Sequence, residues 1–132
     1  MISFIATSAF LAVLNARDLN YQRARSVWED LIARGDSLIC SNYVLVETLA
    51  VIQNRLGMEA VKILNEDVLP VLSVRWVDEP LHSAALSALL IANRRQLSLV
   101  DCVSFEMMRR LGIRTVFTFD SHFHEQGFDC LP

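Results

Sequence analysis

The sequence predicts an α/β fold with a central, mainly parallel β-sheet flanked by helices. Two observations predict it. Short apolar segments alternate along the chain with longer segments of helical periodicity, which is the pattern of successive strand–helix units. The apolar segments have few polar positions, as in strands that are buried on both faces. At 132 residues the chain is long enough to bury one core, so we expect a single domain spanning residues 1–132.

The first half of the chain contains two expected strands and four expected helices. Thr7 or Ser8 is a suitable N-cap for the first helix. In the second helix apolar residues recur at i, i+3, i+4, i+7 and i+8, and Gly35 ends it. Gly57 separates the third helix from the fourth. The expected elements are a strand at 2–6, helices at 7–15 and 20–34, a strand at 37–40, and helices at 42–56 and 58–69.

The second half contains three expected strands and two expected helices. Asp78 is a suitable N-cap, and Pro80 falls in the first helical turn, where a missing N–H has no cost. Ser98 and Asp101 have the spacing of a capping box for the next helix, which Gly112 ends. The expected elements are a strand at 71–77, helices at 78–93 and 98–111, and strands at 114–119 and 128–131.

Composition and charge limit the class of protein. Hydrophobic residues make up 53% of the chain, but no apolar run approaches the roughly 20 residues that a membrane span requires. The segment at residues 1–3 lacks the basic region of a signal peptide, so we expect a cytoplasmic protein with no membrane association. The formal net charge of −3 argues against non-specific nucleic-acid binding through bulk charge. The apolar content predicts a well-filled core, in which we place Trp28 and Trp76.

The cysteines indicate no metal site. Cys40, Cys102 and Cys130 are odd in number, and none belongs to a Cys-x-x-Cys motif. All three have apolar neighbours, so we interpret them as buried free thiols in a reducing compartment. The His-x-His pattern of His122 and His124 is too short to indicate a zinc site.

Three carboxylates stand out because their sequence neighbours are apolar: Glu47, Asp101 and Asp120. Each one alone has a purely structural explanation. Asp101 completes the capping box with Ser98, and Asp120 caps the turn at residues 121–123. Glu47 extends to solvent from a half-buried helix.

Together the three carboxylates predict a metal site. Desolvating an ionised carboxylate costs several kcal/mol unless it gains a partner, and none of the three has a Lys or Arg beside it in sequence. If the fold brings them together, they repel one another and their pKa values rise. A divalent cation removes this conflict, and oxygen ligands select a hard ion, Mg²⁺ or Mn²⁺. Such a site suits phosphoryl chemistry.

Four stretches occur in a characteristic order: IATSAF at residues 5–10, CSNYVLVETLA at 40–50, LSLVDCVSFEMMRRLGI at 97–113 and VFTFDSHFHEQGF at 116–128. In these stretches, and over essentially its whole length, the chain resembles the PIN-domain ribonucleases, specifically the VapC toxins of bacterial toxin–antitoxin pairs. The last two stretches are the more specific ones.

The resemblance implies a three-layer PIN-like fold and metal-dependent hydrolysis of RNA phosphodiesters. Glu47, Asp101 and Asp120 match three acidic positions of the family, which would hold Mg²⁺ or Mn²⁺. The family's habits also imply a homodimer and a cognate antitoxin protein that lies over the active-site groove. The sequence does not indicate which RNA is cleaved.

The family's first Asp falls on Ala6, which carries no ligand atom. Thr7 and Ser8 match the polar residues that follow this Asp and orient water near the metal. Losing a residue that supports a metal ligand typically costs about 10–100-fold in metal affinity or activity, and losing a ligand should cost at least as much. We therefore predict that this chain is inactive or severely impaired.

Two histories account for Ala6. The residue is natural and marks a degenerate member kept for binding, or it is a deliberate substitution that silences a toxic enzyme. The intact remainder of the motif set favours the second. Removing one of four repelling carboxylates is also expected to stabilise the metal-free fold.

Two rival functions fit parts of the sequence. A non-catalytic PIN-like module that binds a protein or RNA explains Ala6, and an Asp codon at this position in the parent gene would argue against it. A phospho-acceptor receiver domain also gathers acids at strand ends. Such domains open with paired acids and follow a late strand with a Lys, whereas the single lysine here, Lys62, lies in an expected surface helix.

Overall fold

Five parallel strands form one sheet in the computed structural model, which describes residues 1–132. The strand order is β3-β2-β1-β4-β5, so β1 lies at the centre. This arrangement confirms the predicted α/β class and the parallel sheet. The strands are β1 Ile2–Ile5, β2 Ser37–Ser41, β3 Leu72–Arg75, β4 Thr115–Phe117 and β5 Asp129–Leu131.

The central strand β1 is where the order of the sheet reverses. In the parallel ladders Phe4 of β1 is opposite Ile39 of β2 on one side and Val116 of β4 on the other. The chain moves outward from β1 through β2 to β3, and then crosses back to β4 and β5. In parallel sheets a crevice for ligands opens outside the carboxyl ends of the strands at such a reversal.

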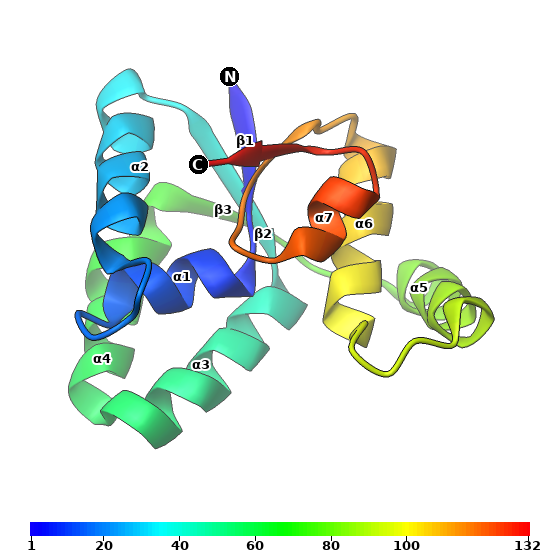
Figure 1. The fold of residues 1–132 in the computed structure, drawn as a ribbon, viewed down its shortest axis with the longest axis horizontal. Helices are drawn as coiled ribbons and strands as arrows, with labels where there is room; N and C mark the ends of the chain where they lie inside the picture. Colours follow the sequence, from blue (N-terminus) through cyan, green and yellow to red (C-terminus); the bar gives the residue numbers. More distant parts are fainter.

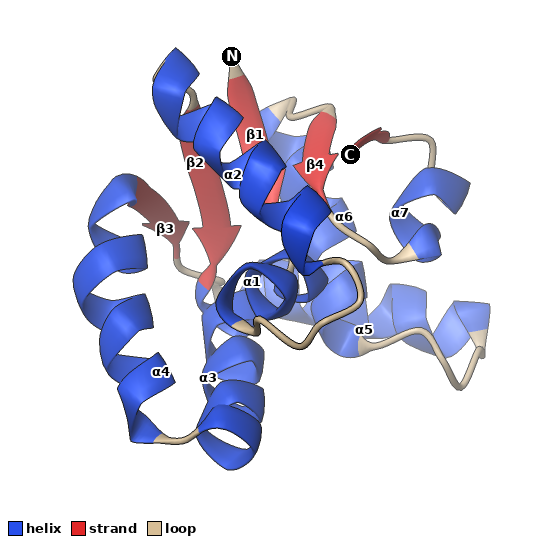
Figure 2. Cartoon of the chain, turned by 60° about the vertical axis from the view of Figure 1, so that its left-hand side comes forward, coloured by secondary structure: helices blue, strands red, loops and turns tan.

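Seven α-helices cover both faces of the sheet. Figure 2 shows α1 and α2 crossing in front of the strands, with α6 behind them. Helix α5 packs against α6 and lies at the far side of the molecule from α2 (Figure 1). The helices are α1 Thr7–Leu14, α2 Tyr21–Arg34, α3 Asn42–Leu56, α4 Met58–Ile63, α5 Glu79–Ala92, α6 Leu99–Leu111 and α7 Ser121–Glu125.

Side-chain caps fix the starts of several helices as predicted. The Asp78 carboxylate accepts a hydrogen bond from the Leu81 N–H at 2.9 Å at the start of α5. Ser98 and Asp101 form the predicted capping box of α6. The predicted cap of α1 is wrong. The N-cap residue is Ala6, which makes no side-chain cap, because Thr7 and Ser8 already have helical backbone and lie in the first turn.

Three predicted elements differ in extent. Helix α4 ends at Ile63 and widens into a π-helical turn, Leu64–Val68, followed by a 3-10 turn, Leu69–Val71. Strand β3 is shorter than predicted and is not buried on both faces: as an edge strand it alternates half-buried and exposed residues. Strand β4 ends at Phe117, because Thr118 already turns toward α7.

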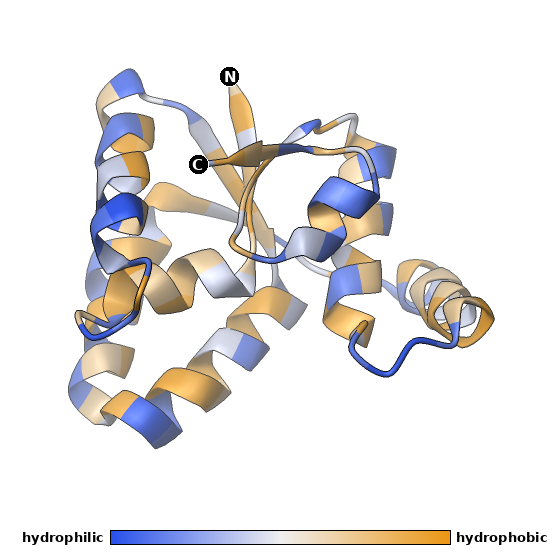
Figure 3. Ribbon diagram, viewed as in Figure 1, coloured by the Kyte–Doolittle hydropathy of each residue, from blue (hydrophilic) through white to orange (hydrophobic).

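The core holds Trp28 at its margin but not Trp76, whose predicted burial is wrong. Trp76 follows the edge strand β3 and is 78% exposed. Leu90 and Ile91 on α5 are also exposed, and Figure 3 shows that much of this helix is made of hydrophobic residues. None of the helices has the length and apolar character that a membrane crossing requires.

All three cysteines are free thiols, as predicted, but only two of them are buried. Burial raises the pKa of Cys40 to about 12, so this thiol is unreactive at neutral pH. Cys130 is half-buried on the edge strand β5.

Candidate functional site

A cavity of about 330 Å³ opens at the carboxyl end of the sheet beside β1 and β4. It lies where the strand order reverses, and its walls come from four separate regions of the chain. All six site residues predicted from the sequence line it. The lining residues are Ala6, Thr7, Ser8, Leu11, Glu47, Val51, Gln96, Ser98, Asp101, Asp120 and Phe123.

Asp101 reaches the cavity from the first turn of α6. Its Oδ2 accepts a hydrogen bond from the Ser98 N–H at 3.2 Å, and its own N–H donates to Ser98 Oγ at 3.0 Å. The capping box therefore fixes the direction of the carboxylate and leaves Oδ1 without a hydrogen bond. Burial raises the pKa of Asp101, and the charge of Asp120 raises it further.

Asp120 reaches the cavity from the segment between β4 and α7. Its Oδ1 accepts a hydrogen bond from the His122 N–H at 2.9 Å, which caps α7, while its own N–H donates to Thr118 Oγ1 at 3.0 Å. The structural roles weighed for Asp101 and Asp120 are thus both present. Each role uses one carboxylate oxygen, so the other remains available to a ligand.

Glu47 lines the same cavity from α3, where it is half-buried. It does not belong to the tightest group of potential ligand atoms in the cavity. The three acids therefore line one cavity, as the sequence predicts. Of the three, only Asp101 and Asp120 have carboxylate oxygens within 4.8 Å of each other in the closest group of ligand atoms.

Ala6 follows the end of β1 and lines this cavity. It is 4% exposed, and its N–H donates to the carbonyl oxygen of Phe117 at 3.0 Å. Thr7 and Ser8 follow on the cavity wall. The Thr7 hydroxyl is buried without a hydrogen-bond partner, whereas the Ser8 hydroxyl accepts a hydrogen bond from the Phe119 N–H at 2.9 Å.

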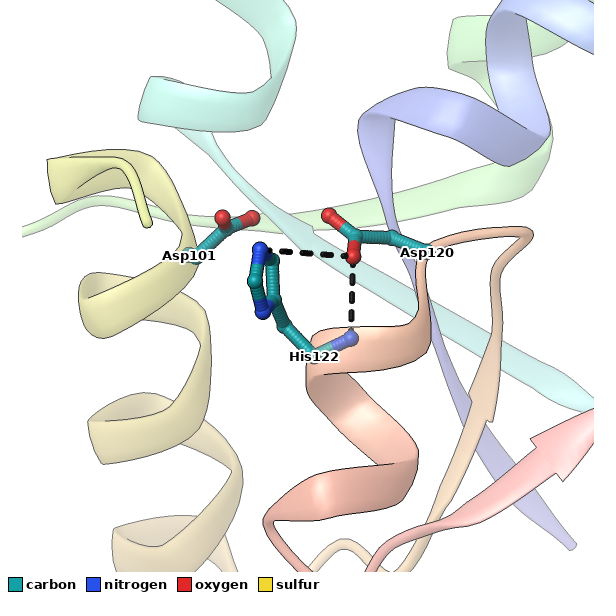
Figure 4. Close-up of side chains that lie close together, drawn as sticks. All are labelled: Asp101, Asp120 and His122. Carbon is teal, nitrogen blue, oxygen red and sulfur yellow. Dashed lines mark hydrogen bonds and ion pairs between the residues drawn. The ribbon is translucent and has the colours of Figure 1, made fainter. Parts of the chain in front are cut away.

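His122 joins Asp101 and Asp120, and sequence reasoning missed it. Carboxylate oxygens of the two acids and a ring nitrogen of His122 all lie within 4.8 Å of one another (Figure 4). The Asp120 cap on the His122 N–H places this residue in the first turn of α7, close to the carboxylate, but the direction of its ring follows from the fold and not from the spacing. The His-x-His pattern gave no indication of this, because His124 is exposed and lies outside the group.

The residues present fit a divalent cation as a donor set. Two carboxylates that share a cavity repel each other, and neither has a Lys or Arg within ion-pairing distance. Each keeps one oxygen free of hydrogen bonds, and the orphaned Thr7 hydroxyl lies in the same cavity. Oxygen donors of this kind suit hard cations.

Comparison with known proteins identifies a family. The family model described as PIN domain matches residues 4–129. Among curated proteins, the chain is 32% identical over 126 residues to the "23S rRNA-specific endonuclease VapC20" of Mycobacterium tuberculosis, covering 95% of this chain and 94% of that protein.

Solved structures agree with this result. The chain matches the crystal structure of Mycobacterium tuberculosis VapC20, described as a sarcin–ricin loop cleaving toxin, with a TM-score of 0.85 and 32% identity, over 97% of this chain and 96% of that one. FitAcB from Neisseria gonorrhoeae matches with a TM-score of 0.70 and 17% identity, over 100% and 97% of the two chains. VapBC2 from Rickettsia felis, bound to a promoter DNA fragment, matches with a TM-score of 0.72 and 14% identity, over 98% and 97%. The last two show similarity of fold alone.

Proposed function

The chain belongs to the PIN-domain family, and from this premise we propose that it is a metal-dependent endoribonuclease, the toxin of a toxin–antitoxin pair, impaired by Ala6. The single observation that carries the proposal is the placement of Asp101 and Asp120 in one cavity at the reversal of the sheet, next to Ala6. Crowded carboxylates without a basic partner at such a crevice favour a cation and an anionic substrate over a purely structural role.

In this proposal Asp101, Asp120 and Glu47 hold Mg²⁺ or Mn²⁺. A divalent ion there would supply an activated water and offset the charge that gathers on the phosphate. The backbone N–H groups of Ser98 and His122 keep the two aspartates oriented. Ser8 and Thr118, whose hydroxyls lie 3.2 Å apart, hold the segment that carries Asp120.

RNA has a candidate path beside this cavity. A neighbouring cavity of about 380 Å³ shares Asp120 with it and is lined by Asn20, Arg23 and His124, among others. Arg23 lies over the ring of Phe119, with 5.8 Å from its guanidinium carbon to the ring centroid. An Arg placed there can bind a phosphate of the substrate, while an aromatic ring offers a stacking surface for a base.

The substrate class and partners follow from the relatives. Because VapC20 is named a 23S rRNA-specific endonuclease, 23S rRNA is the first substrate to test. An antitoxin partner and a homodimer complete the proposal by family resemblance, and exposed apolar side chains such as Leu90 and Ile91 of α5 are available to protein partners. Light scattering on the purified chain, alone and with its antitoxin, measures both assemblies.

A second function rests on Ala6 itself. A PIN-like module without the first carboxylate would bind RNA or a protein partner without cutting. The two functions differ in the result of one substitution, because Ala6→Asp restores cleavage only if the rest of the site is competent.

The test is RNA cleavage by Ala6→Asp. We expect this variant to cleave 23S rRNA with Mg²⁺ or Mn²⁺ and to stop when EDTA is added. The unmodified chain should be at least about 10-fold slower, from the cost of a missing metal contact. A folded Ala6→Asp protein that binds RNA but leaves it intact with either metal would instead support the binding module.

A further inference from the structure

The His122 ring lies between charged groups without a hydrogen bond at either nitrogen. Its side chain is 13% exposed. Nε2 is 4.0 Å from Asp120 Oδ1, and Nδ1 is 3.7 Å from Glu125 Oε2. Both distances exceed that of a hydrogen bond, and Nδ1 is buried without a partner. Neither ring nitrogen is therefore occupied by a protein group, and both are available to a ligand.

The ring points one nitrogen at the gap between the two aspartates. Figure 4 shows this nitrogen facing the space between the Asp101 and Asp120 carboxylates, and the dashed line to Asp120 identifies it as Nε2. Ligand atoms of the three residues lie within 4.8 Å of one another. Two atoms bound to one ion at about 2.1 Å lie at most about 4.2 Å apart, so a small side-chain rotation closes the set.

The other side of the ring has the support that metal-binding histidines usually have. Such a histidine directs its second nitrogen at a carboxylate, which fixes the ring orientation and its tautomer. Here Glu125 lies on that side of His122. Glu125 is in turn held by Arg94, at 2.9 Å between Nη1 and Oε2. The Arg94–Glu125 pair therefore places a carboxylate 3.7 Å from Nδ1, on the side of the ring away from the two aspartates.

We propose that His122 Nε2 is a metal ligand, giving this chain a mixed Asp101–Asp120–His122 centre in place of an all-carboxylate one. The inference rests on the metal centre of the proposed function and adds a nitrogen donor next to Asp101 and Asp120, in the closest group of ligand atoms, to which Glu47 does not belong. An imidazole nitrogen shifts the preference of a site from Mg²⁺ toward ions such as Co²⁺ and Zn²⁺. It also supplies a ligand in a site whose first carboxylate position is occupied by Ala6.

The test observes the nitrogen directly. Electron spin-echo envelope modulation of Mn²⁺ bound to the full chain detects ¹⁴N coordinated to the ion. We expect a ¹⁴N signal in the unmodified chain and in His124→Ala, a matched control on the same short helix. We expect the ¹⁴N signal to disappear in His122→Ala and in His122→Asp. The second variant keeps a carboxylate as a ligand at this position, so that Mn²⁺ still binds when the nitrogen is removed.

Calorimetric titration supplies the second readout. His122→Asp should lower the ratio of Co²⁺ affinity to Mg²⁺ affinity by at least about 10-fold, and His124→Ala should leave it unchanged. Bound Mn²⁺ without ¹⁴N coupling in the unmodified chain overturns this inference and leaves the metal centre standing. Folded protein that binds no Mn²⁺ overturns both. A ¹⁴N signal that persists in both His122 variants also overturns the inference.

Discussion

The Ser8 hydroxyl accepts a hydrogen bond from the backbone N–H of Phe119 at 2.9 Å, although the two residues are 111 positions apart. The same hydroxyl lies 3.2 Å from Thr118 Oγ1, which accepts a hydrogen bond from the Asp120 N–H at 3.0 Å. The first turn of α1 is thereby joined to the segment that presents Asp120. Ser8, two positions after Ala6, thus helps to set the geometry of a carboxylate from the other end of the chain.

Ser8→Ala should therefore affect both stability and metal binding. It leaves the Phe119 N–H without its acceptor, which typically costs about 1–3 kcal/mol of unfolding free energy. Mn²⁺ affinity should fall by about 10–100-fold because Asp120 loses its support. Urea denaturation and calorimetry measure the two effects. Ser26→Ala, on the exposed face of α2, is the control, and equal behaviour of the two variants would contradict the prediction.

Asp101 makes metal-free stability depend on pH. Burial, with a contribution from Asp120, raises its pKa above the ordinary value of 3.8, so the folded chain holds this proton more tightly than the unfolded chain does. The stabilisation of the folded state by this more tightly held proton is complete at a pH below the ordinary pKa. It is lost as the pH rises through the raised pKa of the folded chain.

Asp101→Asn removes this dependence and keeps an oxygen that can accept the Ser98 N–H. In metal-free buffer, the Tm of the variant minus the Tm of the unmodified chain should increase as the pH is raised from about 4 to about 7. This range begins near the ordinary pKa of Asp. Thermal denaturation by circular dichroism measures it, with exposed Asp30→Asn as control. A Tm difference that is constant with pH would show that Asp101 is not perturbed.

Ala6→Asp should make the fold more responsive to metal. A ligand that binds only the folded state raises its stability by an amount that grows with the logarithm of its affinity, so Mn²⁺ should raise the Tm of the variant more than that of the unmodified chain. Without metal, repulsion from Asp101 and Asp120 lowers stability. An Asp at this N-cap position of α1 opposes that loss by about 0.5–2 kcal/mol, a contribution that the sequence did not reveal. Differential scanning fluorimetry with and without Mn²⁺ measures both, and equal Mn²⁺ shifts would contradict the expectation.

Arg23→Gln should weaken RNA binding in a salt-dependent way. Arg23 lines the cavity that adjoins Asp120 and makes no ion pair. If it neutralises one phosphate, its loss lowers the slope of log affinity against log salt concentration by about 1. Arg25→Gln is the matched control, because Arg25 lies on the same helix and already pairs with Glu29 at 3.6 Å. Fluorescence anisotropy measures the slopes, and identical values for the two variants would exclude Arg23 from the RNA path.

Much of the fold could be predicted from local signals. Asp78 and the Ser98–Asp101 pair start helices because their side chains satisfy exposed N–H groups, and Gly35 and Gly112 end helices in the left-handed conformation. The shared cavity of Asp101 and Asp120 could also be predicted, since parallel strands bring their carboxyl ends to one edge of the sheet.

The remainder depended on tertiary geometry. His122 enters the site because the Asp120 cap directs the first turn of α7 inward, and no spacing rule encodes that direction. Trp76 is exposed because β3 is an edge strand, which sequence order does not reveal. Glu47 lies outside the closest group of ligand atoms. Its distance from the aspartates is set by the packing of α3 against α1 and α6, which the sequence does not encode locally.

Anomalous diffraction from Mn²⁺-soaked crystals of Ala6→Asp tests most directly whether these acids converge on a cation. We predict a single strong manganese peak in the cavity, bordered by residue 6, Asp101 and Asp120, and its loss in Ala6→Asp/Asp101→Asn. An ordered cavity with no manganese at saturating concentration, or manganese bound only elsewhere on the surface, would contradict the account.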